Sequence, residues 1–380
     1  MNITKTGNFL FVFLPLMTIF CMGVFLDVHK TKSERERRML TVMPENPLLS
    51  PQEFERALSD HIWGRDTLID WYFKLGIGLD LGTKKTLIGS DGWLFQNEFH
   101  DPHNLHNLQS YANKIDLSSQ QIKKLRDDLS LIQKLCDENN IKMYLTFPPD
   151  KHRVYARYMP TYILRDNRPS LAKRVAKLLP KEINFVPLED ALVQASMNEE
   201  NLLYYKTESH WAEDAAYLAY RLLMDKIKQD FPEVKTAQPE DFTVSKISDI
   251  FSPYIVSSTG PKYTRGNLFV TGLENTEAVY THYELKKEHN IMVKWEKNFK
   301  YSVNPNKKYN VYIIGDSYGT YMSYFFAETF NRVYFYRFNP PGEKFGIFFN
   351  SRLQEMKEQK TDILILSVSD LKLMYLTKAF

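Results

Sequence analysis

Hydrophobic positions along the chain follow two alternating spacings, and this alternation predicts an α/β fold. The clearest helix is predicted over residues 118–140, where apolar side chains recur at helical spacing behind a capping serine at position 118 or 119. An apolar run over residues 141–147 predicts a strand that ends at two prolines. The same pattern predicts further helices over 169–179, 188–197, 211–229 and the residues after Ser317, and further strands over 183–186, 309–314 and 362–368. Strands that alternate with helices indicate a three-layer α/β/α sandwich with a mostly parallel sheet.

The segments around this core have weaker patterns. Residues 51–76 have apolar positions at near-helical spacing until glycines interrupt them. Residues 87–95 predict a hairpin, because apolar residues flank a turn with two glycines. Residues 240–300 predict short strands and turns.

The amino end contains an uncharged apolar run, Phe9 to Leu26, of about 18 residues, which is the lower limit for a helix that spans a bilayer. No small-x-small cleavage site follows it, so we predict an uncleaved single-span membrane anchor rather than a signal peptide. The alternative is a buried core helix. The predicted organisation is an anchor over 1–29, a juxtamembrane linker over 30–50 and one large domain over 51–380.

The charges that flank this run favour one orientation. Five basic residues follow it within a short distance: Lys30, Lys32, Arg35, Arg37 and Arg38. The positive-inside rule therefore places the large domain in the cytoplasm. The alternative on this basis is a hydrolase that faces the cytosol.

Composition excludes several classes of protein. Hydrophobic residues make up 43% and charged residues 25% of the 380 residues, which excludes a mostly disordered chain and a polytopic membrane protein. The formal net charge of +3 is too small to indicate nucleic-acid binding. Two cysteines cannot form a disulfide framework or a four-cysteine zinc site. A loose histidine cluster at positions 100, 103 and 106 lacks a fixed metal-ligand spacing, and we predict neither a metal nor a cofactor.

A Gly-Asp-Ser sequence at residues 315–317 follows the strand predicted over 309–314 and precedes a helical pattern. Gly315 allows a tight turn, and Ser317 then lies at a helix amino terminus at the carboxyl end of a strand, where open α/β sheets bind ligands. Free N–H groups at a helix amino terminus can stabilise an oxyanion. We therefore predict that Ser317 is a nucleophile. The alternative is that Asp316 or Ser317 only caps the helix.

A serine hydroxyl needs a base, and the segment from Tyr204 to Trp211 offers one. His210 is the predicted base. Glu208 lies two residues before it, and in an extended segment both side chains point to one side, so Glu208 is predicted to orient the imidazole. The alternative is that His210 is an ordinary surface or core histidine.

These segments together resemble the AlgX/AlgJ type of SGNH-hydrolase-like proteins, the alginate O-acetyltransferase family, and the related DHHW family. The matching features are the amino-terminal anchor and five motifs in the family order: Ser59-Asp60-His61 to Arg65, the Gly-x-Asp-Gly-Trp-Leu-Phe turn at 89–95, Pro148-Pro149-Asp150-Lys151 with Tyr155, Thr207 to Trp211, and Gly315-Asp316-Ser317. Gly266-Asn267-Leu268 resembles a Gly-Asp-Leu segment of the family. In this resemblance His210 matches the family histidine and Ser317 the family nucleophile. Glu208 stands where the family has aspartate, and Asn267 where it has the aspartate of Gly-Asp-Leu. The resemblance also makes Gly315 and Asn267 candidates for the oxyanion hole or substrate contacts.

The resemblance implies a membrane-anchored O-acetyltransferase that transfers an acetyl group through a serine to a hydroxyl of an exported or cell-surface polysaccharide. It implies a domain on the outer side of the cytoplasmic membrane, opposite to the charge rule, and we follow the resemblance. The implied partners are a polysaccharide acceptor, a membrane-bound O-acyltransferase that supplies acetyl groups, and the lipid bilayer, with no nucleic acid. Two alternatives remain: an acetyl esterase with the same Ser-His site, and a non-catalytic anchored scaffold that binds glycan.

Overall fold

The structure is a computed structural model. It describes residues 17–18, 30–33, 38–46, 50–62, 64–65, 86–97, 107–206, 208–248, 278–289, 291–296, 299–338 and 345–373. The chain divides into two compact units, Met1–Leu81 with Val270–Glu274 and Gly82–Phe269 with Asn275–Phe380. The boundaries predicted at residues 29 and 50 stay predictions.

In its described residues, the smaller unit contains a short antiparallel pair, β1 (Lys32–Ser33) and β2 (Arg38–Met39), and the helix α2 (Pro51–Asp60). Thr41 binds the end of α2, because Asp60 Oδ2 accepts hydrogen bonds from the Thr41 N–H at 2.8 Å and from its hydroxyl at 2.9 Å. The helix predicted over 51–76 is thus present over 51–60, and residues 66–85 lie outside the described part of the chain.

The predicted anchor over Phe9–Leu26 also lies outside the described residues, apart from positions 17 and 18. Within the part of the chain that the structure describes, no helix is both long enough and apolar enough to cross a bilayer.

The larger unit is built around one seven-stranded sheet with the strand order β6-β5-β13-β11-β12-β10-β9. Its strands are β5 (Lys142–Thr146), β6 (Asn184–Val186), β9 (Met292–Glu296), β10 (Phe299–Val303), β11 (Asn310–Gly315), β12 (Arg332–Arg337) and β13 (Ile363–Ser367). The first five strands in that order pair in parallel, whereas β10 pairs antiparallel with both β12 and β9.

The sheet is therefore mixed, and the prediction of a mostly parallel sheet is corrected. Only residues 297–298 separate β9 from β10 in the sequence, and so short a connection forces two strands to run antiparallel. The pattern over 240–300 predicted short strands but did not show that two of them extend the main sheet. It also missed β12 and the following helix α12 (Phe345–Glu358).

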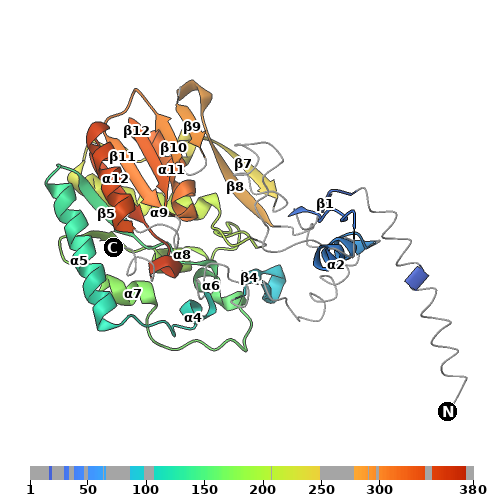
Figure 1. Cartoon of the computed structure of the whole chain (residues 1–380). Coiled ribbons are helices and arrows are strands. Elements are labelled where there is room, and N and C mark those ends of the chain that lie inside the picture. Colours follow the sequence, from blue (N-terminus) through green and yellow to red (C-terminus); the bar gives the residue numbers. More distant parts are fainter. Residues whose placement is uncertain are drawn as a thin grey trace, which may run out of the picture. The chain divides into compact units, whose positions relative to one another are not determined.

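Helices cover both faces of this sheet (Figure 1). They are α4 (Asn107–Tyr111), α5 (Ser119–Asp137), α6 (Lys151–Val154), α7 (Leu171–Ala176), α8 (Glu189–Ala195), α9 (Glu213–Asp230), α11 (Ser317–Thr329) and α12. Along β11, Val311 and Ile313 pack in one hydrophobic cluster with α9 and α11, while Tyr312 and Ile314 pack in another with α5, α7 and α12. Alternate side chains of a strand point to opposite faces, so the sheet has a hydrophobic core on each side. The predicted three-layer α/β/α arrangement is confirmed for this unit.

Local signals explain the best-predicted elements. Ser118 caps α5 by accepting the Gln121 N–H at 3.2 Å, and the Gln121 side chain accepts the Ser118 N–H at 2.9 Å. This reciprocal capping box satisfies two N–H groups that the helix itself cannot bond. The central strands β11 and β13 are almost fully buried, as continuous apolar runs in a parallel sheet require.

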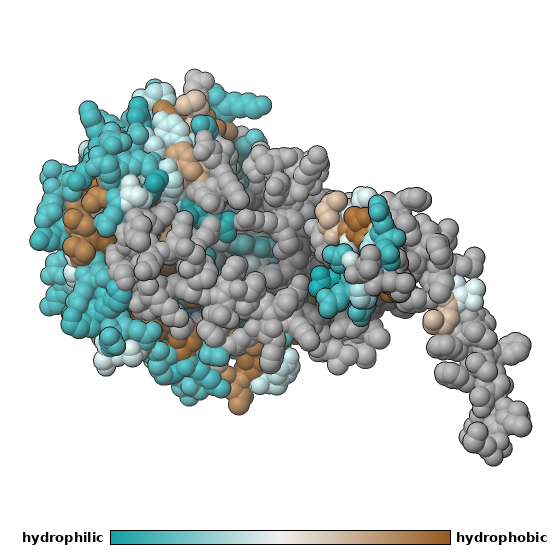
Figure 2. All heavy atoms as spheres, in the orientation of Figure 1, coloured by the Kyte–Doolittle hydropathy of each residue, from teal (hydrophilic) through white to brown (hydrophobic). Residues whose placement is uncertain are grey.

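In the described part of the larger unit, two antiparallel pairs lie outside the main sheet. The hairpin of β3 (Thr86–Ile88) and β4 (Leu94–Gln96) confirms the one predicted over 87–95, and β7 (Phe242–Ser248) pairs with β8 (Val279–Leu285). On the face of the larger unit that Figure 2 shows, the coloured residues are mostly hydrophilic, with separate hydrophobic patches among them.

Candidate active site

Ser317 is the first residue of α11, and only Asp316 separates it from the end of β11. Asp316 is the helix cap, because its Oδ1 accepts the Tyr318 N–H at 3.1 Å. Its other oxygen accepts the Ser369 N–H at 3.0 Å, which ties the start of α11 to the end of β13. The capping alternative is therefore right for Asp316. Because Asp316 provides the cap, the Ser317 hydroxyl is not needed for this purpose.

Gly315 has a different role from the one predicted. It does not form a tight turn, since it stays in register with Arg337 on β12 and with Ser367 on β13. A Cβ atom at this position would lie 2.6 Å from the Ser367 carbonyl oxygen, closer than any real Cβ contact. Glycine thus allows two strands to approach closely just before the nucleophile candidate. Its contact with a substrate stays a prediction.

His210 lies within hydrogen-bond distance of Ser317, 107 residues away in the sequence, with 2.7 Å between Nε2 and the serine Oγ. The histidine belongs to a loop whose ends are joined by an antiparallel bridge between Tyr204 and Trp211. The Ala212 N–H also donates to the Leu203 carbonyl at 2.8 Å. The loop is therefore closed at its base, and it presents the His210 side chain, 29% exposed, to Ser317.

Glu208 binds the other side of the imidazole. Its Oε1 lies 2.7 Å from His210 Nδ1, and its Oε2 accepts the His210 backbone N–H at 2.9 Å. The prediction that this segment is extended is wrong, because residues 208–210 form a bend. The bend lets the longer glutamate side chain turn back and contact both the ring and the backbone of the same histidine.

Electrostatics keep the Glu208 carboxylate ionised. Its side chain is only 13% exposed, and this burial by itself raises the pKa of the carboxyl group. The charge and hydrogen bonds of His210, together with the charge of Lys151, outweigh burial and lower the pKa of Glu208 below its ordinary value.

The three side chains form one hydrogen-bonded chain in the order Glu208, His210, Ser317. When Nδ1 of a neutral imidazole donates to a carboxylate, Nε2 has a free lone pair and can accept a hydroxyl proton. The arrangement can therefore remove a proton from Ser317 and stabilise the imidazolium that results.

Aromatic side chains surround His210. The ring of Tyr321 lies 6.0 Å from the imidazole, roughly parallel to it, and the ring of Tyr318 lies 5.8 Å away. Tyr321 comes one helical turn after Ser317, so the sequence pattern of α11 already placed both on one face. Sequence reasoning missed Tyr321, and it gave no role to Lys151, which it named only within a motif and whose contacts are non-local.

The remaining predicted residues are not tested. Asn267 and the histidines at 100, 103 and 106 lie outside the described residues. Within the described ranges, no group of three or more His, Cys, Asp or Glu side chains is arranged to hold a metal ion. The predicted absence of a metal stays a prediction.

Residues 86–334, more than half of the chain, match the family described as "SGNH hydrolase-like domain, acetyltransferase AlgX". No curated protein matches the chain significantly. Among solved structures, Bacillus cereus PatB1 is similar with a TM-score of 0.52 and 14% identity, over 76% of this chain and 99% of that chain. A structure of the same protein with a sulfonyl adduct has a TM-score of 0.52 and 15% identity, over 76% and 98% of the two chains.

A third similar structure is the O-acetyltransferase domain of Pseudomonas putida AlgJ, with a TM-score of 0.44 and 13% identity, over 76% of this chain and 92% of that chain. At this level of identity the likeness to PatB1 shows the fold, and the family match shows the relationship. The chain belongs to the AlgX family of SGNH hydrolase-like acetyltransferase domains.

Proposed function

We propose that this protein is an O-acetyltransferase that transfers an acetyl group through Ser317 to a hydroxyl of a polysaccharide. The observation that carries the proposal is the chain of hydrogen bonds from Glu208 through His210 to Ser317, with 2.7 Å at each histidine nitrogen. Membership in an acetyltransferase family supports the choice of an acetyl group.

In the first half of the reaction, Ser317 Oγ attacks the carbonyl carbon of an acetyl ester while its proton moves to His210 Nε2. N–H groups in the first turn of α11, apart from the Tyr318 N–H that Asp316 accepts, are the proposed donors to the developing oxyanion, because the first turn of a helix leaves them without intrahelical acceptors. The tetrahedral intermediate then collapses, and the donor alcohol leaves with the proton from His210.

In the second half, a sugar hydroxyl gives its proton to His210 Nε2 and attacks the acetyl-serine. Collapse of the second intermediate returns the proton to Ser317 and releases the acetylated sugar. Glu208 stays ionised and stabilises the imidazolium in both halves.

The location and the partners are part of the proposal. We infer an anchor at Phe9–Leu26, with the catalytic unit on the outer side of the cytoplasmic membrane where exported polysaccharides are found. A membrane-bound O-acyltransferase is the proposed source of acetyl groups. The family match supports the acceptor class.

The proposal predicts acetyl transfer in preference to hydrolysis. The protein is incubated with an acetyl ester donor and oligosaccharide acceptors, and mass spectrometry of the sugars is expected to find a mass gain of one acetyl group. Acetate release at the same rate with and without acceptors, and no acetylated sugar, would instead indicate an acetyl esterase. If the protein shows neither product and a sulfonyl fluoride does not label Ser317, a non-catalytic scaffold is indicated.

Changing Glu208 to Gln is expected to reduce turnover on the order of 10⁴-fold, because a neutral amide neither selects the productive tautomer nor stabilises the imidazolium. Glu208→Asp is the matched control. It keeps the charge but shortens the side chain by one methylene, so we expect a loss of about 10² at most from misplacement. Steady-state kinetics with an acetyl ester reporter measure both. Equal losses in the two variants would contradict a role for the charge.

A further inference from the structure

Lys151 is a buried cation close to the candidate active site. It is the first residue of α6 and only 2% of the residue is exposed. Its Nζ donates hydrogen bonds to three backbone carbonyls, those of Tyr205 at 2.9 Å, Lys206 at 3.0 Å and Glu208 at 2.9 Å. An ammonium group has three N–H donors, and here three converging carbonyls of one short segment receive them.

The three carbonyls belong to the loop that carries the acid and the base. Glu208 is one of the bonded residues, and His210 follows two positions later. A shift of that backbone would change the 2.7 Å contacts on both sides of the imidazole. Misplacement of a catalytic group by about 1 Å costs on the order of 10² in rate.

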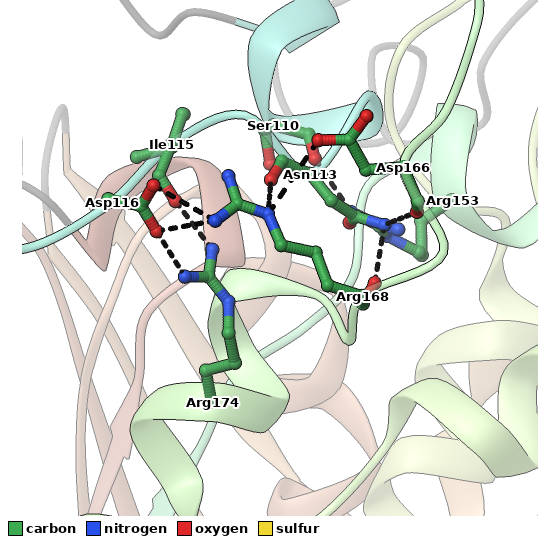
Figure 3. A network of polar contacts seen from close by, with 8 residues as sticks. All are labelled: Ser110, Asn113, Ile115, Asp116, Arg153, Asp166, Arg168 and Arg174. Carbon is green, nitrogen blue, oxygen red and sulfur yellow. Dashed lines mark hydrogen bonds and ion pairs between the residues drawn. The ribbon is translucent and has the colours of Figure 1, made fainter.

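The helix that carries Lys151 is itself fixed. Asp150 caps α6 by accepting the Arg153 N–H at 2.8 Å, and the Arg153 guanidinium donates to the Ser110 carbonyl at 2.8 Å. Figure 3 shows that this contact lies beside a wider network of polar contacts, which joins the segment after α4 to the segment before and within α7.

Arg168 and Arg174 are the central side chains of that network (Figure 3). Both bind the Asp116 carboxylate, Arg168 at 2.8 Å and 2.9 Å and Arg174 at 2.5 Å. Asn113 donates to the carbonyls of Asp166 at 2.8 Å and Arg168 at 2.7 Å. The Asn113 N–H also donates at 3.0 Å to the Ser110 carbonyl that accepts Arg153, so this network and the helix that carries Lys151 share one acceptor.

The surroundings of Lys151 strengthen its charge effect. The rings of Trp93 and Phe95 lie 5.6 Å and 5.3 Å from Nζ, so aromatic side chains rather than water cover this side of the ammonium group. A charge acts more strongly where water is excluded. Burial raises the pKa of Glu208, the charge and hydrogen bonds of His210 lower it, and the positive charge of Lys151 lowers it further.

Other charged groups near the loop point elsewhere. The Lys206 Nζ donates to the Asp91 carbonyl at 3.0 Å, and Asp150 lies 3.6 Å from the His152 ring. Among the residues that the structure describes, the groups that lower the pKa of Glu208 most are His210 on its own loop and Lys151 on α6.

We propose that Lys151 is a positioning residue for the acyl-transfer site, because its three hydrogen bonds fix the loop that carries Glu208 and His210. Its positive charge also favours the ionised form of Glu208. This inference rests on the proposed function, since it adds one positioning residue to the same acyl-transfer site. It also explains two sequence motifs, because the Pro-Pro-Asp-Lys segment supplies the ammonium group and the turn at 89–95 supplies the aromatic rings that cover it.

The test compares Lys151→Met with the parent protein over a range of pH, by acetyl ester turnover and by the rate at which a sulfonyl fluoride labels Ser317. We expect both rates to fall at least ten-fold. We also expect the acid limb of the pH profile to move to higher pH. The sign follows from the charge: removal of the lysine cation favours protonation of the Glu208–His210 pair, so the form of the pair that accepts the serine proton, an ionised carboxylate with a neutral imidazole, is lost at a higher pH.

Lys206→Met is the matched control, because it removes the same charge two residues from Glu208 but from a side chain that points to Asp91. We expect its acid limb to coincide with that of the parent. Parental rates in Lys151→Met would overturn the proposal, and so would lower rates with an unmoved acid limb, which would indicate a purely structural lysine.

Lys151→Arg keeps the test decisive if the methionine variant does not fold. A planar guanidinium keeps the charge but cannot bond the same three carbonyls. We expect its acid limb to stay in place while the rates fall at least five-fold, and parental rates would overturn the proposal. If the parent itself neither turns over the ester nor reacts with the sulfonyl fluoride, the proposed function fails together with this inference. If the parent reacts and Lys151→Met matches it, only this inference fails.

Discussion

Replacing Ser317 by Ala is expected to reduce acetyl ester turnover on the order of 10⁶-fold, because no covalent acetyl-enzyme can form. The change removes a single oxygen whose described hydrogen bond goes to His210 at 2.7 Å. Asp316 still caps α11, so the helix and its connection to Ser369 remain. We therefore expect the melting temperature to stay within a few degrees of the parent value.

Ser323→Ala on the same helix is the control for this change. Its hydroxyl donates to the Thr320 carbonyl at 2.7 Å within the helix and does not contact His210. We expect parental turnover from it, measured with the same ester. Substantial turnover by Ser317→Ala would show that another group carries the acetyl and would exclude the proposed mechanism.

Replacing His210 by Gln is expected to reduce turnover by a similar factor, on the order of 10⁶-fold, because the serine then has no base to accept its proton. The effects of Ser317 and His210 should not add, since each acts only through the other. The double variant is therefore expected to be no slower than either single variant. Labelling of Ser317 by a sulfonyl fluoride should also fall, which separates loss of the base from loss of sugar binding.

His282→Gln is the matched histidine control. His282 lies on β8, and its Nδ1 is 3.1 Å from a Glu213 carboxylate oxygen, which raises the pKa of the imidazole above its ordinary value. A raised pKa stabilises the fold at low pH, and this contribution is lost as the pH rises through the folded-state pKa. We therefore expect His282→Gln to lower the stability of the fold at acidic pH and to leave turnover at higher pH unchanged. Parental labelling of Ser317 in His210→Gln would contradict the assignment of the base.

The candidate site shows which contacts sequence reasoning could anticipate. Ser317 was identified because a buried strand, Gly-Asp-Ser and a helix follow one another directly, and these are local features. Glu208 and His210 were paired because they are two residues apart, although the bend that joins them was predicted as an extended segment. The contact between His210 and Ser317 spans 107 residues, and residue types together with the family resemblance predicted it, whereas spacing could not.

Lys151 marks the limit of that reasoning. The sequence placed it in a Pro-Pro-Asp-Lys motif, but its bonding partners are backbone carbonyls up to 57 residues away. Backbone carbonyls have no residue identity, so no pattern of side chains reveals them. The same applies to Gly315, whose requirement comes from the Ser367 backbone on a neighbouring strand and not from a turn.

The sequence by itself determined the helices α5, α7, α8, α9 and α11, the strands β5, β6, β11 and β13, and the chemical types at the site. These depend on apolar spacing and capping residues within about one helical turn, as the Ser118–Gln121 capping box illustrates. Only the tertiary structure decided the strand order, the antiparallel edge formed by β9 and β10, and the meeting of α6, the 204–211 loop and α11 at one end of the sheet. The physical reason is that strand pairing and side-chain contacts between distant segments are fixed by the packing of the whole core, whereas local periodicity only reports which face of each element is buried.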